Sequence, residues 1–513
     1  MKLIEKLTES HFILGIDIGN SSSAIAYFDA FRKTPEIIDL SGGYGKPAAP
    51  TVVQYIPETG EWVFGEYAVL NANVGGREIT LQNLPEKLGM KTSVMIGGKS
   101  YGIPGLLALY IAELVANCKN LNPKAVIAGI VVCVPEFMPE NALDELRLAF
   151  RLSGCDNDKV EFISETQCVF RNFFYRKKPV SETVALLDYG NRELRGGVYE
   201  ISPEDGGVKI IAAALLNDSG LSVGKIDKNT SDFFSSLYYG ERPGPAKKTV
   251  EGQIASFSYQ HKDLLFQKNI RSKPIKLYFN FAYPPFFLTV RAASAENLSR
   301  PFETGFEKFI YALLGNALDQ SAKPYRPHQI NSVIACGGGF DMLWAKESLK
   351  KIFPDAVVHL YKNQKCAAAE GASIIAAEKL GVYEPVKMIA EDNLKLEYDF
   401  GFAVKKDGSQ KFHPLVEKNS YWWQDKYVSG FIVNEKIRGE LNLEMIRRDK
   451  NGSLSPFGNF SLKGLPERPK GTTRLDIMVH FLNVGKISVK IKDAGFGQLF
   501  PASGYESVFV MDL

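Results

Sequence analysis

The stretch Gly15-Ile-Asp-Ile-Gly-Asn-Ser-Ser-Ser-Ala-Ile-Ala-Tyr-Phe28 joins two apolar runs through a turn rich in glycine and serine. This pattern predicts a strand, a tight turn and a second strand. Backbone N–H groups in such a turn can converge on the oxygens of a phosphate group, and serine hydroxyls add donors. An ordinary hairpin that binds nothing explains the turn about as well. The candidate phosphate-binding residues are Gly15, Asp17, Gly19, Asn20, Ser21 and Ser22, and Asp17 is placed to hold a hydrated Mg²⁺ through its waters.

Two segments further along the chain repeat the combination of an apolar strand and glycine. The first, Ala185-Leu-Leu-Asp-Tyr-Gly190, ends in Asp188 and Gly190 and suggests two duplicated lobes that face one cleft. The second, Val333-Ile-Ala-Cys-Gly-Gly-Gly-Phe-Asp341, leads into a predicted helix over 342–352. Its glycines would let a base or ribose approach the backbone, and a helix N-terminus favours anions. The candidate nucleotide-binding residues in these segments are Gly190, Gly337, Gly338, Gly339 and Asp341.

The chain changes character near residue 385. Up to residue 384, strand-like runs such as 126–134 and 184–201 alternate with helical stretches such as 106–118 and 142–152, which is typical of an α/β fold. Gly371 lies in a predicted apolar helix, 366–380, where a small residue permits a close helix crossing. After residue 394, short runs rich in Phe, Val, Ile and Tyr alternate with turns and predict a small all-β domain. Residues 385–393 are the expected linker.

Composition narrows the classes of function. With 513 residues and 45% hydrophobic content, the chain is expected to form two or more globular domains. A formal net charge of +3 supplies no strong field for nucleic acid or an anionic membrane, so neither is an expected partner. The longest apolar run, 125–134, is far shorter than the roughly 20 residues that a membrane-spanning helix requires. No signal peptide is recognised, so the expected location is cytoplasmic, and the six scattered cysteines are expected to be reduced core thiols.

Taken in order, the glycine-rich segments resemble the nucleotide-binding motifs of the actin, sugar kinase and heat shock protein 70 superfamily. The first connecting motif is matched by 163–167, which contains Glu165, the second phosphate motif by 187–198, and the second connecting motif by 366–377. The resemblance implies a two-lobed actin-like ATPase, with lobe I at about 1–187 and 365–384 and lobe II at about 188–364. It implies ATP or ADP with Mg²⁺ as cofactors, catalytic roles for Glu165 and Asp188, and Asp17 and Asp188 as Mg²⁺ ligands through water.

The segment Phe457-Gly-Asn-Phe-Ser-Leu-Lys-Gly-Leu-Pro-Glu-Arg-Pro-Lys-Gly471 resembles the β-sandwich of DnaK-type chaperones. The chain is therefore identified, by resemblance, as a divergent heat shock protein 70 family member whose β-sandwich spans 394–513. The implied partners are an unfolded or extended polypeptide and a co-chaperone or nucleotide-exchange partner. Trp422 and Trp423 would cover the peptide-binding groove of the implied β-sandwich or mark a partner surface. The implied peptide-binding residues are Phe402, Val404, Phe431, Leu441 and Leu443, although each is individually explained as well by the sandwich core.

Several positions depart from the family pattern. In the second phosphate loop, Asn191 and Arg192 replace glycines, Glu193 replaces threonine and Arg195 replaces an aspartate, so hydrolysis is expected to be slow or absent. Pro85 stands at the position of the family's water-positioning lysine, and Asp341 at that of an adenine-stacking arginine. No helical lid follows the β-domain, so bound peptide is expected to leave quickly. Met388-Ile389 is a weak version of the family's leucine-rich linker, and weak coupling between the two sites is expected.

Three hypotheses follow. The leading one is a lidless heat shock protein 70-like chaperone that binds ATP and extended peptide, with weak or impaired hydrolysis. The second is a catalytically inactive pseudo-ATPase scaffold that binds a specific protein partner. The third, a sugar-kinase-like phosphotransferase, needs an aspartate base, and the corresponding loop offers Arg195 instead.

Overall fold

A computed structural model describes residues 11–41, 45–71, 78–136, 138–204, 206–245, 250–255, 257–258, 274–280, 282, 284–315, 324–361, 363–390, 396, 398–406, 409–418, 420, 426–449, 451–483 and 486–512. By their contacts, these residues form two units. The α/β unit holds the described residues up to Ile389, apart from Ile211–Ala213 and Pro324. Those four residues and the described residues from Ala390 onward form the β unit.

A six-stranded sheet is built around β1 (His11–Ile18). The next strand, β2 (Ser22–Asp29), pairs antiparallel with β1, as the strand–turn–strand pattern predicts. On the other side, β10 (Val126–Val134) pairs parallel with β1, and β11 (Val160–Ser164) pairs parallel with β10. The remaining strands, β3 (Thr34–Ile37) and β4 (Ala49–Pro50), pair with β2.

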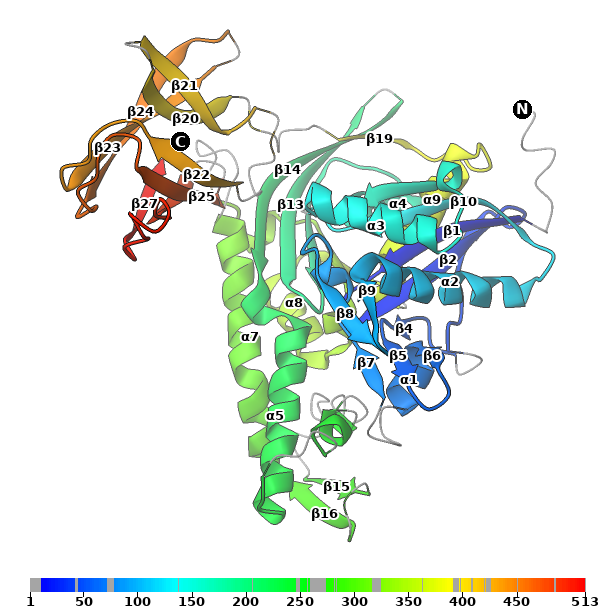
Figure 1. Ribbon diagram of the computed structural model, residues 1–513. Helices are drawn as coiled ribbons and strands as arrows, with labels where there is room; N and C mark the ends of the chain where they lie inside the picture. The colour runs from blue at the N-terminus through cyan, green and yellow to red at the C-terminus, as the bar shows by residue number, and fades with distance from the viewer. Residues whose placement is uncertain are drawn as a thin grey trace. The chain divides into compact units, whose positions relative to one another are not determined.

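The second six-stranded sheet repeats this arrangement. Its central strand, β12 (Glu182–Tyr189), pairs antiparallel with β13 (Leu194–Glu204) and parallel with β17 (Ser332–Cys336). The strand β18 (Val357–Leu360) pairs parallel with β17, and β14 (Gly207–Asp218) lies beside β13. The same strand order in both sheets agrees with a duplicated unit. The sixth strand, β19 (Lys387–Ala390), lies beside β14 (Figure 1), so part of the predicted linker segment forms a strand.

Helices cover both faces of the first sheet. One apolar cluster joins Leu14 and Ile16 of β1 to α2 (Ile103–Leu121) and α3 (Glu140–Leu152). A separate cluster joins Ile13 of the same strand to α4 (Glu165–Arg176) and α9 (Ala367–Lys379). Because neighbouring residues of a strand face opposite sides, this alternation confirms a three-layer α/β arrangement with two buried faces.

The other helices and strands of the α/β unit surround these two sheets. Among them, α5 (Val223–Glu241) and α7 (Ala292–Gly315) pack against each other (Figure 1), and α7 packs against α8 and β13. The further elements are α1 (Gly65–Asn71), α8 (Leu343–Ile352), β5 (Val53–Ile56), β6 (Glu61–Phe64), β7 (Ile79–Leu81), β8 (Ser93–Ile96), β9 (Lys99–Gly102), β15 (Ile275–Phe279) and β16 (Phe286–Val290).

The β unit contains two four-stranded sheets. The order of the first is β21 (Ser409–Val416), β20 (Asp399–Lys406), β23 (Glu440–Arg448), β24 (Leu454–Lys463). The order of the second is β22 (Lys426–Val433), β25 (Thr473–Asn483), β26 (Lys486–Asp493), β27 (Glu506–Asp512). Alternate residues along β25 and β26 are buried, including Ile477, Val479, Ile487 and Val489, which confirms the predicted all-β character of this part of the chain. Trp422 and Trp423 lie outside the described residues.

The cysteines and the helices of these units bear on two features of the composition. All six cysteines are free thiols, and all except Cys155 are buried, as expected for reduced core residues. No helix in the described ranges combines the length and hydrophobicity that crossing a bilayer requires.

Candidate functional site

The first glycine-rich turn connects β1 and β2. Asp17 lies near the end of β1, between its register partners Cys133 of β10 and Ala24 of β2. Gly15 is required by packing, because a Cβ there would lie 2.1 Å from the carbonyl oxygen of Ala369 in α9. Gly19 serves the turn itself, since its Cβ would lie 2.5 Å from the carbonyl oxygen of Ser22. Internal geometry therefore accounts for both glycines.

Asn20 ties this turn to two other segments. Its side-chain amide donates to Glu86 Oε2 at 3.0 Å and to Asn191 Oδ1 at 3.2 Å, and its own Oδ1 accepts from the N–H of Glu86 at 3.2 Å. The turn is also held by Thr51, whose N–H donates to the carbonyl of Ser21. The Asn20–Asn191 contact brings together the first and second candidate phosphate loops, as the resemblance implies.

The predicted catalytic residues Glu165 and Asp188 lie at the ends of different elements. Glu165 is the first residue of α4, which begins after Ser164, and the Ser164 hydroxyl caps the helix by accepting from the N–H of Gln167 at 3.2 Å. Asp188 is the penultimate residue of β12. Its register partner in β13 is Arg195.

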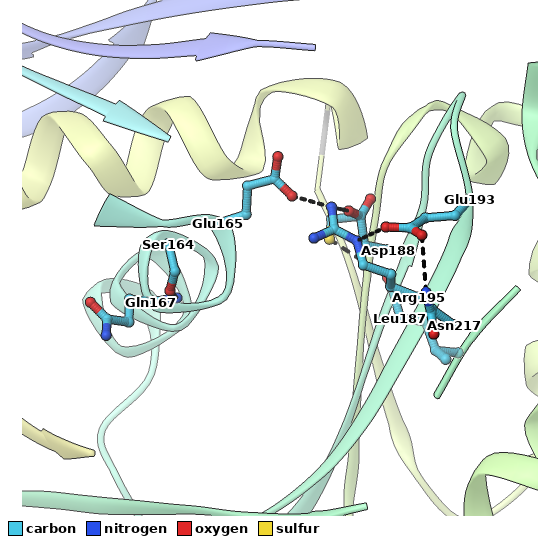
Figure 2. Close-up of polar contacts among 9 residues, drawn as sticks. Ser164, Glu165, Gln167, Leu187, Asp188, Glu193, Arg195 and Asn217 are labelled. Carbon is cyan, nitrogen blue, oxygen red and sulfur yellow. Dashed lines mark hydrogen bonds and ion pairs between the residues drawn. The ribbon is translucent and has the colours of Figure 1, made fainter. Parts of the chain in front are cut away.

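Arg195 joins these carboxylates (Figure 2). Its Nη2 donates to Glu165 Oε2 and, at 2.9 Å, to Asp188 Oδ2. Its Nε lies 3.4 Å from Glu193 Oε1 as an ion pair, without a hydrogen bond. Glu193 Oε2 accepts a hydrogen bond from the side-chain amide of Asn217 at 3.1 Å. One guanidinium therefore faces three carboxylates from α4, β12 and the turn before β13. Such charge-assisted contacts are among the stronger hydrogen bonds in proteins.

Burial shifts the pKa values in this group. Burial, and after it the nearby Glu165 and Asp188, raise the pKa of Asp17 well above its usual value, although Arg195 opposes the shift. Burial also raises the pKa of Asp188 to about 6, despite the opposing charge of Arg195. For Arg195, burial opposes the charged form, but the charges of Glu165, Asp188 and Glu193 outweigh it and raise the guanidinium pKa. Arg195 therefore keeps its charge, and burial makes Asp188 harder to ionise than an exposed aspartate.

The third glycine-rich segment packs against the second loop. Gly337 has a φ of 87°, and a Cβ there would lie 2.5 Å from Asp188 Oδ1. A Cβ on Gly339 would lie 2.2 Å from the ring of Tyr189, and one on Gly338 would lie 2.5 Å from Lys365. Gly337 and Gly339 let this segment approach the end of β12, so their presence is explained without a ligand.

An aromatic cluster adjoins this segment and was not anticipated. Tyr189, between Asp188 and Gly190, is fully buried and stacks on Phe306 with ring centroids 5.6 Å apart. Phe340 and Trp344 contact it edge-on. The family pattern D-x-G marks Tyr189 only as the variable position, so no local signal identifies it as core. Asp341, which was predicted to lie near the adenine, forms an ion pair with Lys365, and its Oδ2 is 3.9 Å from Lys365 Nζ.

Glu136 is a second residue that sequence reasoning missed. It lies two residues after the end of the strand β10 and is largely withdrawn from solvent. Burial raises the pKa of its carboxyl, while hydrogen bonds with Ser164 and Thr166 and the charge of Arg195 lower it. Its position after a strand end, next to Pro135, is the only sequence signal that it carries.

The residues do not fit the Mg²⁺ that the resemblance implies. A hydrated Mg²⁺ between Asp17 and Asp188 would have to share this place with a guanidinium that is already bonded to Asp188 and Glu165. Across the described ranges, no group of three or more His, Cys, Asp or Glu residues is arranged to hold a metal ion. We therefore assign no reaction step to Mg²⁺.

The predicted peptide-binding residues lie in β20, β22 and β23. Phe402, Leu441 and Leu443 are buried, and the ring of Phe402 contacts those of Phe431 at 5.7 Å and Phe460 at 6.1 Å. Phe431 is half-buried and also contacts His413 at 5.1 Å. Val404 is a residue of β20 whose side chain lies outside the described set. Phe402 and Phe431 are therefore brought together, and Phe431 is the more accessible of the two.

Two family models match parts of this chain. Residues 34–218 match the C-terminal part of a family of unknown function (DUF5716). Residues 395–513, which include the two four-stranded sheets of the β unit, match a domain of unknown function (DUF8552).

Similarity to DnaK chaperones extends over nearly the whole chain at low identity. The chaperone protein DnaK of Thermosipho melanesiensis is 21% identical over 504 residues, which cover 96% of this chain and 80% of that protein. The DnaK of Thermosipho africanus is 21% identical over 503 residues, covering 96% and 79%. The DnaK of Cenarchaeum symbiosum is 22% identical over 506 residues, covering 94% and 71%. The chain is thus similar to heat shock protein 70-type chaperones through both its α/β and its β unit.

Proposed function

We propose that this chain is a heat shock protein 70-like chaperone that binds ATP or ADP in its α/β unit, hydrolyses ATP slowly or not at all, and binds extended polypeptide in its β unit. The observation that supports impaired hydrolysis is the pair of contacts from Arg195 to Glu165 and Asp188. The similarity to DnaK over 96% of the chain supports the general class.

Nucleotide binding is supported by the meeting of the candidate loops. Asn20 of the first turn contacts Asn191 of the second, and Gly337 lies against Asp188 at the end of β12. Segments far apart in the sequence thus come close together. Turns of this kind offer backbone N–H groups to phosphate oxygens.

Impaired hydrolysis follows from the partners of the two predicted catalytic carboxylates. A carboxylate that activates water must be free to accept a proton from it. Glu165 and Asp188 each accept a hydrogen bond from Arg195, which remains charged. Phosphoryl transfer depends on the placement of charge around the phosphate, and here the acidic positions are already neutralised in part.

The test combines calorimetric titration with ATP and ADP and a single-turnover assay on the same sample. We expect saturable binding and no phosphate release above the buffer control. Ser22→Asp should abolish binding, because a carboxylate in the first turn repels the phosphates, while Ser93→Asp, on an exposed position of β8, should bind as the wild type does. Ready turnover would overturn the claim of impaired hydrolysis.

Peptide binding is tested separately, by fluorescence anisotropy of a short labelled apolar peptide. Phe431 is the half-buried predicted contact, so Phe431→Ser should weaken binding by about tenfold or more through lost apolar contact. Val510→Ser, at an exposed position of β27, is the matched control and should bind normally. Equal affinity of the two variants would contradict the assignment of the peptide site.

The second candidate function is a pseudo-ATPase scaffold that binds a specific protein partner. The same Arg195 contacts favour it, together with glycines whose packing roles need no ligand. Absence of ATP and ADP binding in the calorimetric test would replace the first proposal with this one.

A further inference from the structure

The guanidinium of Arg195 lies where acidic side chains from separate parts of the chain converge. It bonds to Glu165 at the start of α4 and to Asp188 at the end of β12. The side chains of Arg195, Glu165 and Asp188 are only 16%, 19% and 22% exposed. Because little water reaches them, their charges are compensated mainly by each other.

Asp17 adds a third carboxylate to this group. It is close enough to Glu165, Asp188 and Arg195 for the charges of all three to act on it. The carboxyl groups of β1, α4 and β12 thus lie near one cation that the chain itself supplies, and Glu193 of the turn before β13 faces the same cation. Carboxylate oxygens are the ligands that hard divalent cations prefer, but beside the guanidinium the described residues form no group of three arranged to hold a metal ion.

A guanidinium and a magnesium ion cannot share these carboxylates. Mg²⁺ requires a near-octahedral shell of oxygens at about 2.0–2.1 Å, whereas a guanidinium carries only N–H donors. Its fixed charge repels a divalent cation at contact distance. To admit the metal, Arg195 would have to give up its hydrogen bonds to both Glu165 and Asp188.

We infer that Arg195 is a built-in cation in the place of a divalent metal ion, so that the wild-type chain binds no Mg²⁺ between Asp17, Glu165 and Asp188. This inference goes beyond the proposed function, because it concerns the protein without nucleotide. A failure of ATP to bind would overturn the proposed function and leave this inference standing.

The test uses Mn²⁺ alone as a paramagnetic probe, with the free ion measured by electron paramagnetic resonance. Wild-type protein should show no tight site, and Arg195→Ala should gain one site that binds Mn²⁺ about tenfold or more tightly than any wild-type site. Arg192→Ala is the matched control, because it removes an exposed arginine of the same turn and leaves the carboxylates paired. It should behave as the wild type does.

A melting-temperature measurement and further variants guard against misreading a misfolded protein. Mn²⁺ should raise the melting temperature of Arg195→Ala but not that of the wild type, because ligands that bind only the folded state stabilise it. Arg195→Gln, which removes the charge but keeps a hydrogen-bond donor next to the carboxylates, is a second variant in case Arg195→Ala does not fold. It should also bind more Mn²⁺ than Arg192→Ala. Adding Asp17→Asn and Glu165→Gln to Arg195→Ala should remove the gained site.

Two results would overturn the inference. One is a tight Mn²⁺ site in the wild type that Mg²⁺ displaces and Asp17→Asn removes, which is measurable even if no Arg195 variant folds. The other is a folded Arg195→Ala or Arg195→Gln chain that binds no more Mn²⁺ than Arg192→Ala.

Discussion

Arg195 lies directly opposite Asp188 in the β12–β13 hairpin, and its Nη2 is 2.9 Å from Asp188 Oδ2. The antiparallel register thus delivers a cation to the end of the strand on which the candidate site depends. The same guanidinium reaches Glu165, in a helix that follows a strand of the other sheet. One side chain therefore links acidic groups at the two six-stranded sheets.

We expect Arg195→Met to destabilise the α/β unit by about 3 kcal/mol in metal-free buffer, because it leaves mostly buried carboxylates without their cation. The shift of the α/β unfolding transition in a thermal or urea scan measures this. Arg192→Met, at an exposed position, should change stability by no more than about 0.5 kcal/mol. Equal effects of the two substitutions would contradict the structural role of the Arg195 contacts.

Gly371→Ala should be strongly destabilising. A Cβ at Gly371 would lie 1.7 Å from the carbonyl oxygen of Cys168, at the crossing of α4 and α9, so the helices would have to separate. Overpacking of this kind costs about 1–3 kcal/mol or more. Gly240→Ala in α5, where a Cβ meets nothing, is the control and should be neutral or slightly stabilising. The midpoints of denaturant-induced unfolding of the two variants measure this difference in stability.

Arg171→Met should loosen strand β19. Arg171 donates to the carbonyl of Val386 at 2.6 Å and forms an ion pair with Glu378 at 3.0 Å. We expect faster amide hydrogen exchange over 386–390, measured by mass spectrometry, since local opening becomes easier. Arg176→Met, which removes a half-exposed arginine of the same helix, should leave exchange there unchanged. Unchanged exchange in Arg171→Met would show that the β14 pairing alone holds this strand.

The β unit should lose stability in acid through one buried ion pair. Arg468 contacts Asp493 through two hydrogen bonds of 2.8 Å, and the two side chains are 4% and 0% exposed. Burial raises the pKa of Asp493, but hydrogen bonds from Ser503 and Arg468 outweigh burial and hold it below its usual value. The stabilisation is therefore complete above the unfolded pKa of about 3.9 and disappears as pH falls through the lower folded value.

Asp493→Asn tests this assignment. It should cost about 3–5 kcal/mol at pH 7, because Arg468 is left buried without its counter-charge. Its unfolding free energy, followed from pH 7 to pH 3, should lack the acid-dependent component that the wild type shows. Parallel pH profiles for the two proteins would contradict the role of Asp493.

Much of the secondary structure was predictable from local pattern. The strands β1 and β2, the long buried strand β10 and the helix α9 appear where the apolar runs and glycine turns predict them. Periodicity and turn chemistry act over a few residues, so they are readable in a single sequence. The β unit follows for the same reason, since its alternating runs select buried and exposed faces strand by strand.

The site was predictable only in its parts. From the sequence, Arg195 is recognisable as a substitution in the second phosphate loop, but its bond to Glu165, 30 residues earlier, depends on how α4 meets the β12–β13 hairpin. In the sequence, Gly337 likewise indicates a nucleotide contact. In the structure, a side chain at this position would collide with Asp188, so packing alone requires the glycine. No local signal identifies Tyr189 as buried, and Glu136 has only its position after a strand end, because their burial arises from packing partners such as Phe306 and Ser164.

Residue order and spacing were enough to establish an α/β part followed by an all-β part, because hydrogen bonding and side-chain alternation within each segment are local properties of the chain. Residue order and spacing were not enough to establish which cation lies in the candidate site. Whether Asp17, Glu165 and Asp188 face a metal ion or a guanidinium depends on long-range contacts between a strand, a helix and a hairpin. Electrostatic interactions act through space over a few ångströms, and folding alone brings these charges within that distance.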